Sequence, residues 1–294
     1  MCDEMQLAGM AREGASRANL NRRQFGQIGA LAAVAAACAP AGHALAQAGL
    51  KETHATFPAP GGKKMDAYFV YQAGGKHPGV IMWPDIAGVR DSFIAMAKRL
   101  ARQGYSVLLL NPYYQDAEAP QFDDFDAFRT GGGMEKVAPW REKLTAPVVM
   151  DITKAAVEFL DKQDSVDTSK GIGVQGYCMS GGFGVWSAAG VPDRIKAVAS
   201  FHGAALVGDS DTAPVKELAQ TKASYLFAIA RNDDKTAPGD KDALRAAAVA
   251  AGRTATVEVI KADHGWMVDD SPVFDVDAAD KVWAEMLTLY KTNL

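Results

Sequence analysis

Short apolar segments of strand length alternate with segments of helical periodicity along most of the chain, and this alternation limits the fold more than any other feature. The strand-length segments are 65–72, 77–84, 105–112, 170–177, 195–203, 223–230 and 255–261. The clearest helical segments are 91–104, 146–163 and 277–293. Strands separated by helices pair into a largely parallel sheet. The sequence therefore predicts an α/β fold with a mostly parallel central sheet and helices on both faces.

One segment interrupts this alternation. Residues 114–143 are polar, rich in Asp and Gly, and contain Pro120 and Pro139. This composition predicts a loop-rich insertion over the sheet, and the sequence leaves open whether the insertion is a lid. Catalytic and binding sites in such folds form at the carboxyl ends of the strands, which is where candidate residues are sought below.

Net charge excludes one class of partner. The chain of 294 residues carries a formal net charge of -4 and shows no basic cluster, whereas nucleic-acid binding requires a basic face. His, Cys and Asp residues do not occur at metal-ligand spacing. We therefore expect no nucleic-acid partner, no metal and no other cofactor.

The N-terminus has the composition of an export signal. Arg22 and Arg23 are adjacent and are followed by an Ala-rich run, and Ala44-Leu45-Ala46 has the small-x-small pattern of a cleavage site. The pattern resembles a twin-arginine signal, with a solvated N-terminal helix as the alternative. We expect residues 1–46 to engage the twin-arginine export machinery and to be cleaved after Ala46. The product is then a periplasmic single domain, 47–294, without stable membrane association.

Cys178 lies in a glycine-rich turn between a predicted strand and a predicted helix. The local sequence is Gly-Tyr-Cys-Met-Ser-Gly over 176–181, which matches a strained nucleophile turn whose neighbours must be small. A thiol at a helix N-terminus is favoured as the thiolate. Ser180 fits worse as the nucleophile, because cysteine would then occupy a position where glycine is expected. The alternative is a buried structural thiol. After cleavage, Cys178 would be the only cysteine, so no internal disulfide is expected.

Candidates for a base and an orienting acid follow Cys178 in chain order. Asp233 and Asp234 come directly after the strand-length segment 223–230, and His264 follows the next one. A nucleophile, an acid and a histidine that each follow a different strand in this order are suited to nucleophilic catalysis. Taken singly, the aspartates are equally compatible with a helix N-cap and His264 with a surface loop. His202 also ends a predicted strand, but no acid precedes it in a workable order, so we interpret it as a packed histidine.

These motifs together resemble the dienelactone hydrolase family, whose members are α/β-hydrolases with a Cys-His-Asp triad. The resemblance extends from about Met65 to Leu289 and includes GYCMSGG, DHGW, VIMWPDIAGVRDSF and RQGYSVLLLNPYY. It implies that Cys178 is the nucleophile, His264 the base and Asp233 its partner, with Asp234 as the alternative acid. It also implies that Asp85 activates the thiol and that the amides of Ile86 and Met179 form the oxyanion hole.

The resemblance predicts a hydrolase that cleaves a small ester or lactone. Where dienelactone-cleaving members carry an arginine for the substrate carboxylate, this chain has Val268, and Arg141 is the candidate replacement. A neutral ester, lactone or thioester is therefore at least as well suited as a dienelactone. Tyr113 and Trp266 are predicted to line the substrate pocket, among several aromatic residues near strand ends. The alternatives are a thioesterase or acyltransferase on the same triad and a non-catalytic ligand-binding protein.

Overall fold

The computed structural model describes residues 49–294, so the predicted export signal at 1–46 lies outside the described residues. Eight strands form a single sheet in the order β1-β2-β4-β3-β5-β6-β7-β8. Their bounds are β1 Leu50–Pro58, β2 Lys64–Gln72, β3 Gly79–Trp83, β4 Ser106–Leu110, β5 Ile172–Tyr177, β6 Ile195–Phe201, β7 Ser224–Ala230 and β8 Ala255–Ile260. β2 is antiparallel to both β1 and β4, and all other neighbouring strands are parallel.

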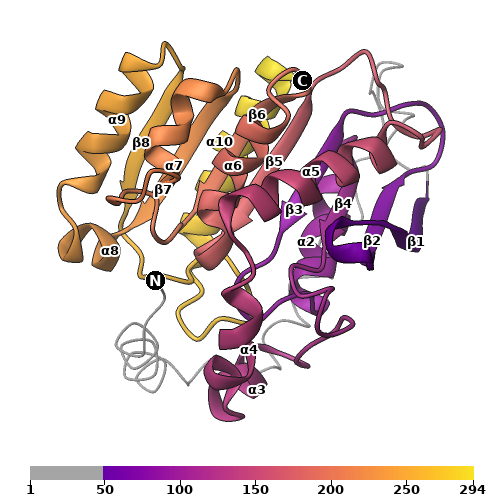
Figure 1. Cartoon of the computed structure of the whole chain (residues 1–294), viewed down its shortest axis with the longest axis horizontal. Helices are drawn as coiled ribbons and strands as arrows, with labels where there is room; N and C mark the ends of the chain where they lie inside the picture. Colours follow the sequence, from indigo (N-terminus) through magenta and orange to yellow (C-terminus); the bar gives the residue numbers. More distant parts are fainter. Residues whose placement is uncertain (1–48) are drawn as a thin grey trace, which may run out of the picture.

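Helices cover both faces of the sheet (Figure 1). The longer helices are α2 Asp91–Ala101, α5 Ala146–Leu160, α6 Phe183–Gly190, α9 Asp240–Ala250 and α10 Val276–Asn293. Buried side chains of α5, α6 and α9 belong to the core on one face, and those of α2 and α10 to the core on the other. The predicted α/β fold with a mostly parallel sheet and helices on both faces is confirmed.

The shorter helices are α7 Pro214–Glu217 and α8 Arg231–Thr236, with the 3₁₀ segments η2 Pro60–Gly62, η3 Cys178–Gly182 and η4 Leu218–Gln220. The two candidate acids, Asp233 and Asp234, lie in the first turn of α8. The edge strand β1 was not predicted. It buries only Ala55 and Phe57 of its nine residues, so it lacks the apolar run that marks the central strands.

The insertion 114–143 is more ordered than its composition predicts. It contains α3 Phe125–Thr130 and α4 Gly133–Arg141, which lie beyond the edge where the parallel strands end (Figure 1). Phe128 and Val137 are fully buried, and this tertiary packing stabilises helices that isolated segments of such length would not form. Within residues 49–294, no helix combines the length and apolarity needed to cross a bilayer.

Candidate active site

Cys178 lies at the turn between β5 and the helical segment that η3 and α6 form together. Its φ is +53°, a left-handed conformation that is strained for a residue with a side chain. Small neighbours are required on both sides. A Cβ on Gly176 would lie 2.1 Å from the Ser180 carbonyl oxygen, and one on Gly181 would lie 2.3 Å from the Gly203 Cα. The glycines of the sequence motif are therefore explained by close backbone contacts.

Ser180 is committed to holding this turn together. Its Oγ accepts the Tyr177 amide hydrogen at 2.9 Å and donates toward the Trp83 carbonyl oxygen, also at 2.9 Å. The side chain is fully buried. This hydroxyl supports the geometry of the turn, in agreement with the preference for Cys178 as the nucleophile.

Asp233, rather than Asp234, contacts the histidine. His264 follows β8, and its Nδ1 lies 2.7 Å from Asp233 Oδ2, while its backbone amide donates to Asn232 Oδ1 at 2.8 Å. Asp234 instead accepts a hydrogen bond from Lys241 at 2.6 Å, on a partly exposed surface. Both acids lie in the first turn of α8, but successive helical residues point about 100° apart, so only one reaches the histidine.

The charges of this cluster stabilise an ion pair. Burial by itself lowers the pKa of His264, but the negative charge of Cys178 and the hydrogen bond to Asp233 outweigh it and raise that pKa to about 10. This raised pKa favours the imidazolium form of His264 near neutral pH, hydrogen-bonded to Cys178 and to Asp233. A thiolate is the reactive form of cysteine, so this arrangement is suited to nucleophilic attack.

Tyr113 joins the segments that carry the two predicted oxyanion-hole amides. Its hydroxyl donates to the Ile86 carbonyl oxygen at 2.8 Å and lies 3.5 Å from Met179 Sδ. The Tyr113 ring is buried, and Trp140 of α4 packs on it with ring centroids 5.4 Å apart. Tyr113 thus links the loop after β3, the turn after β5 and the insertion.

Asp85 forms an ion pair that the sequence did not predict. Both of its carboxylate oxygens accept hydrogen bonds from Arg90, at 2.8 and 2.9 Å, and Oδ1 also accepts the Ala87 amide hydrogen. Among the described residues these are its hydrogen-bond partners, whereas the resemblance implied a contact with the thiol. Arg90 is fully buried at the N-cap of α2, a position that favours short polar or acidic residues. An arginine directly before the predicted helix 91–104 was the sequence signal that could have indicated the Arg90–Asp85 ion pair.

His202 is packed, as predicted, but it lies directly against the candidate base. Its ring centroid is 4.9 Å from that of His264 and 5.7 Å from that of Trp266. Its φ is +40°, and neither ring nitrogen has a hydrogen-bond partner among the described residues. Burial, followed by the charge of His264, lowers the pKa of His202 well below its usual value, so the ring is neutral.

The remaining predicted binding residues lie at different depths. Trp266 is fully buried in the core, where its ring contacts His202, and Val268 is also buried. Arg141 ends α4 and is partly exposed. The predicted substrate contacts of Tyr113, Trp266 and Arg141 stay predictions.

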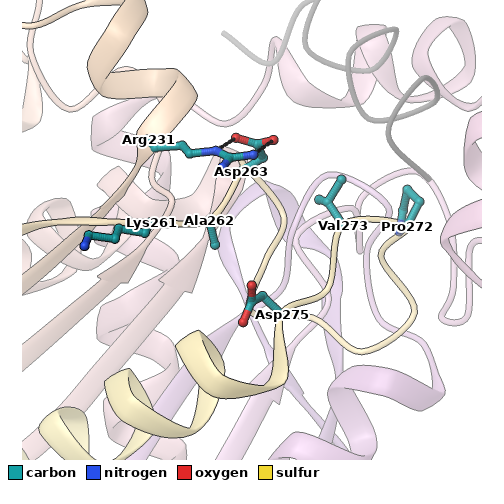
Figure 2. A pocket seen from close by; sticks show the side chains of 7 residues that line it. All are labelled: Arg231, Lys261, Ala262, Asp263, Pro272, Val273 and Asp275. Atoms are coloured by element: carbon teal, nitrogen blue, oxygen red, sulfur yellow. Dashed lines mark hydrogen bonds and ion pairs between the residues drawn. The ribbon is translucent and has the colours of Figure 1, made fainter. Parts of the chain in front are cut away.

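The segment 261–275, which contains His264, is called the histidine loop here. A hollow beside this loop is too small for an ester. It holds about 20 Å³, roughly the room that one water molecule occupies. Figure 2 shows its lining, in which the Arg231 guanidinium pairs with both Asp263 oxygens, at 2.6 and 2.8 Å. Within the described part of the chain, no group of three His, Cys, Asp or Glu residues is arranged to hold a metal ion.

A family model and a named relative each match most of the chain. The model of the dienelactone hydrolase family matches residues 65–294. A Methylorubrum extorquens protein named "Putative carboxymethylenebutenolidase" is 26% identical over 72% of this chain and 71% of its own.

Solved structures share the fold. A dienelactone hydrolase homologue from Klebsiella pneumoniae has a TM-score of 0.70 at 22% identity, covering 83% of this chain and 99% of its own. A dienelactone hydrolase-like promiscuous phosphotriesterase from metagenomic libraries has a TM-score of 0.64 at 19% identity, covering 83% and 98%. Because the family model matches most of the sequence, the chain belongs to the dienelactone hydrolase family.

Proposed function

We propose that the protein hydrolyses a small, uncharged ester or lactone through a covalent intermediate on Cys178. The observation that carries the proposal is the hydrogen-bonded contact between Cys178, in its strained turn, and His264, whose pKa is raised to about 10. Asp233 holds the histidine by its Nδ1, which leaves Nε2 for the reacting groups. Membership of a hydrolase family supports the reaction class.

In the first half-reaction, the thiolate of Cys178 attacks the carbonyl carbon and forms a carbon–sulfur bond. The carbonyl oxygen becomes an oxyanion, which the amides of Ile86 and Met179 are placed to stabilise. When the intermediate collapses, the carbon–oxygen bond to the leaving group breaks. The alkoxide takes the proton of the His264 imidazolium and leaves as the alcohol, so His264 is now neutral.

In the second half-reaction, neutral His264 accepts a proton from water as the water attacks the thioester carbonyl. The carbon–sulfur bond then breaks, the carboxylic acid is released, and the thiolate and imidazolium are restored. We propose that His264 alone activates the thiol, because the carboxylate of Asp85 is held by Arg90. This revises the activating function that the family resemblance implied for Asp85.

The charges near the site favour an uncharged substrate. Val268 supplies no cation at the position of the family's carboxylate-binding arginine, and it is buried. Arg90 is close in the fold but already pairs with two carboxylates, those of Asp85 and Asp270. A substrate carboxylate would therefore meet the carboxylates of Asp85 and Asp270, and the guanidinium of Arg90 would already be paired with them.

The test is hydrolysis of a short p-nitrophenyl ester by the protein and by its Cys178→Ala variant, with circular dichroism to verify folding. We expect activity in the wild type only, with uncharged lactones cleaved faster than carboxylate-bearing ones. Equal rates in both proteins would contradict nucleophilic catalysis by Cys178. Faster cleavage of acyl thioesters than of esters would instead support the thioesterase alternative, and no turnover of either would support the ligand-binding alternative.

We also propose that the mature enzyme is periplasmic, exported through the twin-arginine route. Arg22, Arg23 and the cleavage pattern that ends at Ala46 support this. N-terminal sequencing of protein recovered from the periplasm should begin at Gln47, and replacing both arginines with lysine should retain the precursor in the cytoplasm. An uncleaved N-terminus in the periplasmic fraction would contradict the proposed cleavage.

A further inference from the structure

Arg90 lies in the interior, between segments that meet at the active site. Its side chain is 0% exposed, and its Cζ lies 5.0 Å from the ring centroid of Phe93 and 5.5 Å from that of Phe125. A buried charge is costly unless it is paired and hydrogen-bonded. Arg90 meets this requirement with two carboxylates, Asp85 and Asp270, from distant parts of the chain.

All five N–H groups of the guanidinium are used. Nη1 and Nη2 donate to the two oxygens of Asp85 at 2.8 and 2.9 Å, while Nε and Nη2 donate to those of Asp270 at 2.6 and 2.9 Å. The fifth donor, on Nη1, points to the Gly88 carbonyl oxygen at 3.2 Å. Because the fork is planar and rigid, two bidentate pairs fix the relative orientation of both carboxylates.

Asp270 extends this arrangement to the insertion. Its Oδ2 also accepts the backbone amide hydrogen of Phe125, the first residue of α3, at 2.9 Å. Burial by itself raises the pKa of Asp270, but its hydrogen bond and charge interaction with Arg90 outweigh it and lower the pKa. The residue is in the histidine loop, six positions after His264.

The Asp85 loop, residues 84–90, carries the proposed oxyanion-hole amide of Ile86. The insertion contacts this loop a second time, because Gln121 Oε1 accepts the Val89 amide hydrogen at 3.2 Å. A Cβ on Gly88 would lie 2.1 Å from the same oxygen, so the approach is close. The histidine loop, the Asp85 loop and the insertion are thus connected through a few polar groups.

We propose that Asp270 is a positioning residue which, by binding Arg90 and the Phe125 amide, fixes the histidine loop, the Asp85 loop and α3 in the placement required for catalysis. It touches no reacting group. Its effect is to hold the Ile86 amide, on the Asp85 loop, in register with Cys178. The catalytic part of this inference rests on the proposed hydrolase function, whereas the anchoring of α3 does not.

The experiment compares Asp270→Asn with the wild-type protein. The amide keeps the shape of the side chain but removes the charge that pairs with Arg90. We expect kcat for ester hydrolysis to fall by about tenfold or more, since small displacements of catalytic groups have effects of this size.

The other readouts should separate positioning from general damage. KM should change by less than about threefold. Alkylation of Cys178 by iodoacetamide should stay within about twofold, because Asp270 does not contact the proposed thiolate–imidazolium pair. Hydrogen exchange of 122–130 should become faster.

Two variants complete the design. Asp280→Asn is the matched control, because it breaks the exposed ion pair with Arg99, 2.7 Å long, and should leave every readout unchanged. Asp270→Glu keeps the charge but displaces the carboxylate by one methylene group, so its kcat and its exchange should fall between those of the wild type and Asp270→Asn. If Asp270→Asn does not fold, Asp270→Glu decides.

Two results would overturn the proposal. One is a folded Asp270→Asn variant whose kcat and hydrogen exchange equal those of the wild type. If Asp270→Asn does not fold, the same result in Asp270→Glu would overturn the proposal. The other is a parallel loss of kcat and thiol alkylation, which would indicate general disruption of the site. If the wild type itself hydrolyses no ester, the proposed function fails, and the exchange of 122–130 still decides whether Asp270 anchors α3.

Discussion

At the scale of single residues, chemistry depends on which polar groups the fold brings together. Cys178 is held in a strained conformation, and its contact with His264 helps to raise the pKa of that histidine. Asp233 and Asp234 are adjacent in sequence but have different partners, His264 and Lys241. These contacts lead to two predictions that can be tested with purified variants.

The first concerns the pH dependence of thiol reactivity. Because the pKa of His264 is raised to about 10, the imidazolium persists as pH rises and is lost only through that value. A paired thiolate is then present well below pH 8.5, where a free cysteine titrates. Alkylation of Cys178 should vary by less than about threefold between about pH 6 and pH 8.5, whereas a free thiol gains about a hundredfold.

The control for this prediction is His264→Gln, in which the cation is absent. Its alkylation rate should rise with pH as that of a free thiol does. A rate in the wild type that climbs through pH 8.5 in the same way would argue against the ion pair.

The second prediction compares the two acids. Asp233→Asn should lower kcat by at least about a hundredfold, because an amide neither fixes the histidine tautomer nor stabilises the imidazolium. Asp234→Asn should keep kcat within about twofold, because it breaks only a partly exposed ion pair with Lys241. Equal losses in both variants, measured with the same ester, would mean that α8 holds the acid differently.

At the scale of elements, the turn from β5 into η3 and α6 sets the position of Cys178, the proposed nucleophile. Its geometry depends on close backbone contacts at Gly176 and Gly181 and on the hydroxyl of Ser180. The histidine loop and the Asp85 loop are then placed against this turn. Elements that end at the same edge of a parallel sheet can supply one site from distant sequence positions.

Gly176→Ala should damage the turn. The new Cβ would lie 2.1 Å from the Ser180 carbonyl oxygen, so the backbone must shift, at an expected cost of about 1–3 kcal/mol in unfolding free energy. Gly239→Ala is the matched control, because its Cβ would meet no atom within 4 Å and its φ is -82°. Urea denaturation should leave the control within about 0.5 kcal/mol of the wild type, and an equal loss in both would contradict the clash.

At the scale of the whole molecule, two buried histidines contribute to stability with opposite pH dependence. The pKa of His264 is raised, so its contribution is complete below the unfolded value of about 6.5 and is lost as pH rises through about 10. The pKa of His202 is lowered, chiefly by burial, so its effect has the other sign. Neutral His202 therefore contributes fully to stability above about pH 6.5, and this contribution falls as the pH decreases below about 6.5.

His202→Gln should therefore flatten the acid side of the stability curve. Below about pH 6.5, the unfolding free energy of the variant relative to the wild type should rise by up to about 1.4 kcal/mol for each unit by which the pH is lowered. The reason is that glutamine does not titrate. Urea denaturation of both proteins between about pH 5 and pH 8 measures the difference. A difference that is independent of pH would show that His202 titrates alike in the folded and unfolded chains.

The sequence by itself determined the sheet class and the tight turn at Cys178, because both depend on local patterns. Strand-length apolar runs predict buried strands, and glycines around Cys178 predict a tight turn, whatever the rest of the chain does. The edge strand β1 and the helices of the insertion were missed because their short or polar segments gain stability only by packing on other elements.

Only the tertiary structure decided which groups meet. It brought Asp233 rather than Asp234 to His264, placed His202 against the same ring, and paired Arg90 with Asp270, which lies 180 positions away in the sequence. Hydrogen bonds and ion pairs require atoms to lie within about 3 Å with suitable orientation, and a pattern along one chain segment does not fix such distances between segments. The strained turn at Cys178 is thus predictable from local sequence, whereas the partners of its side chain are set by how distant loops pack at one edge of the sheet.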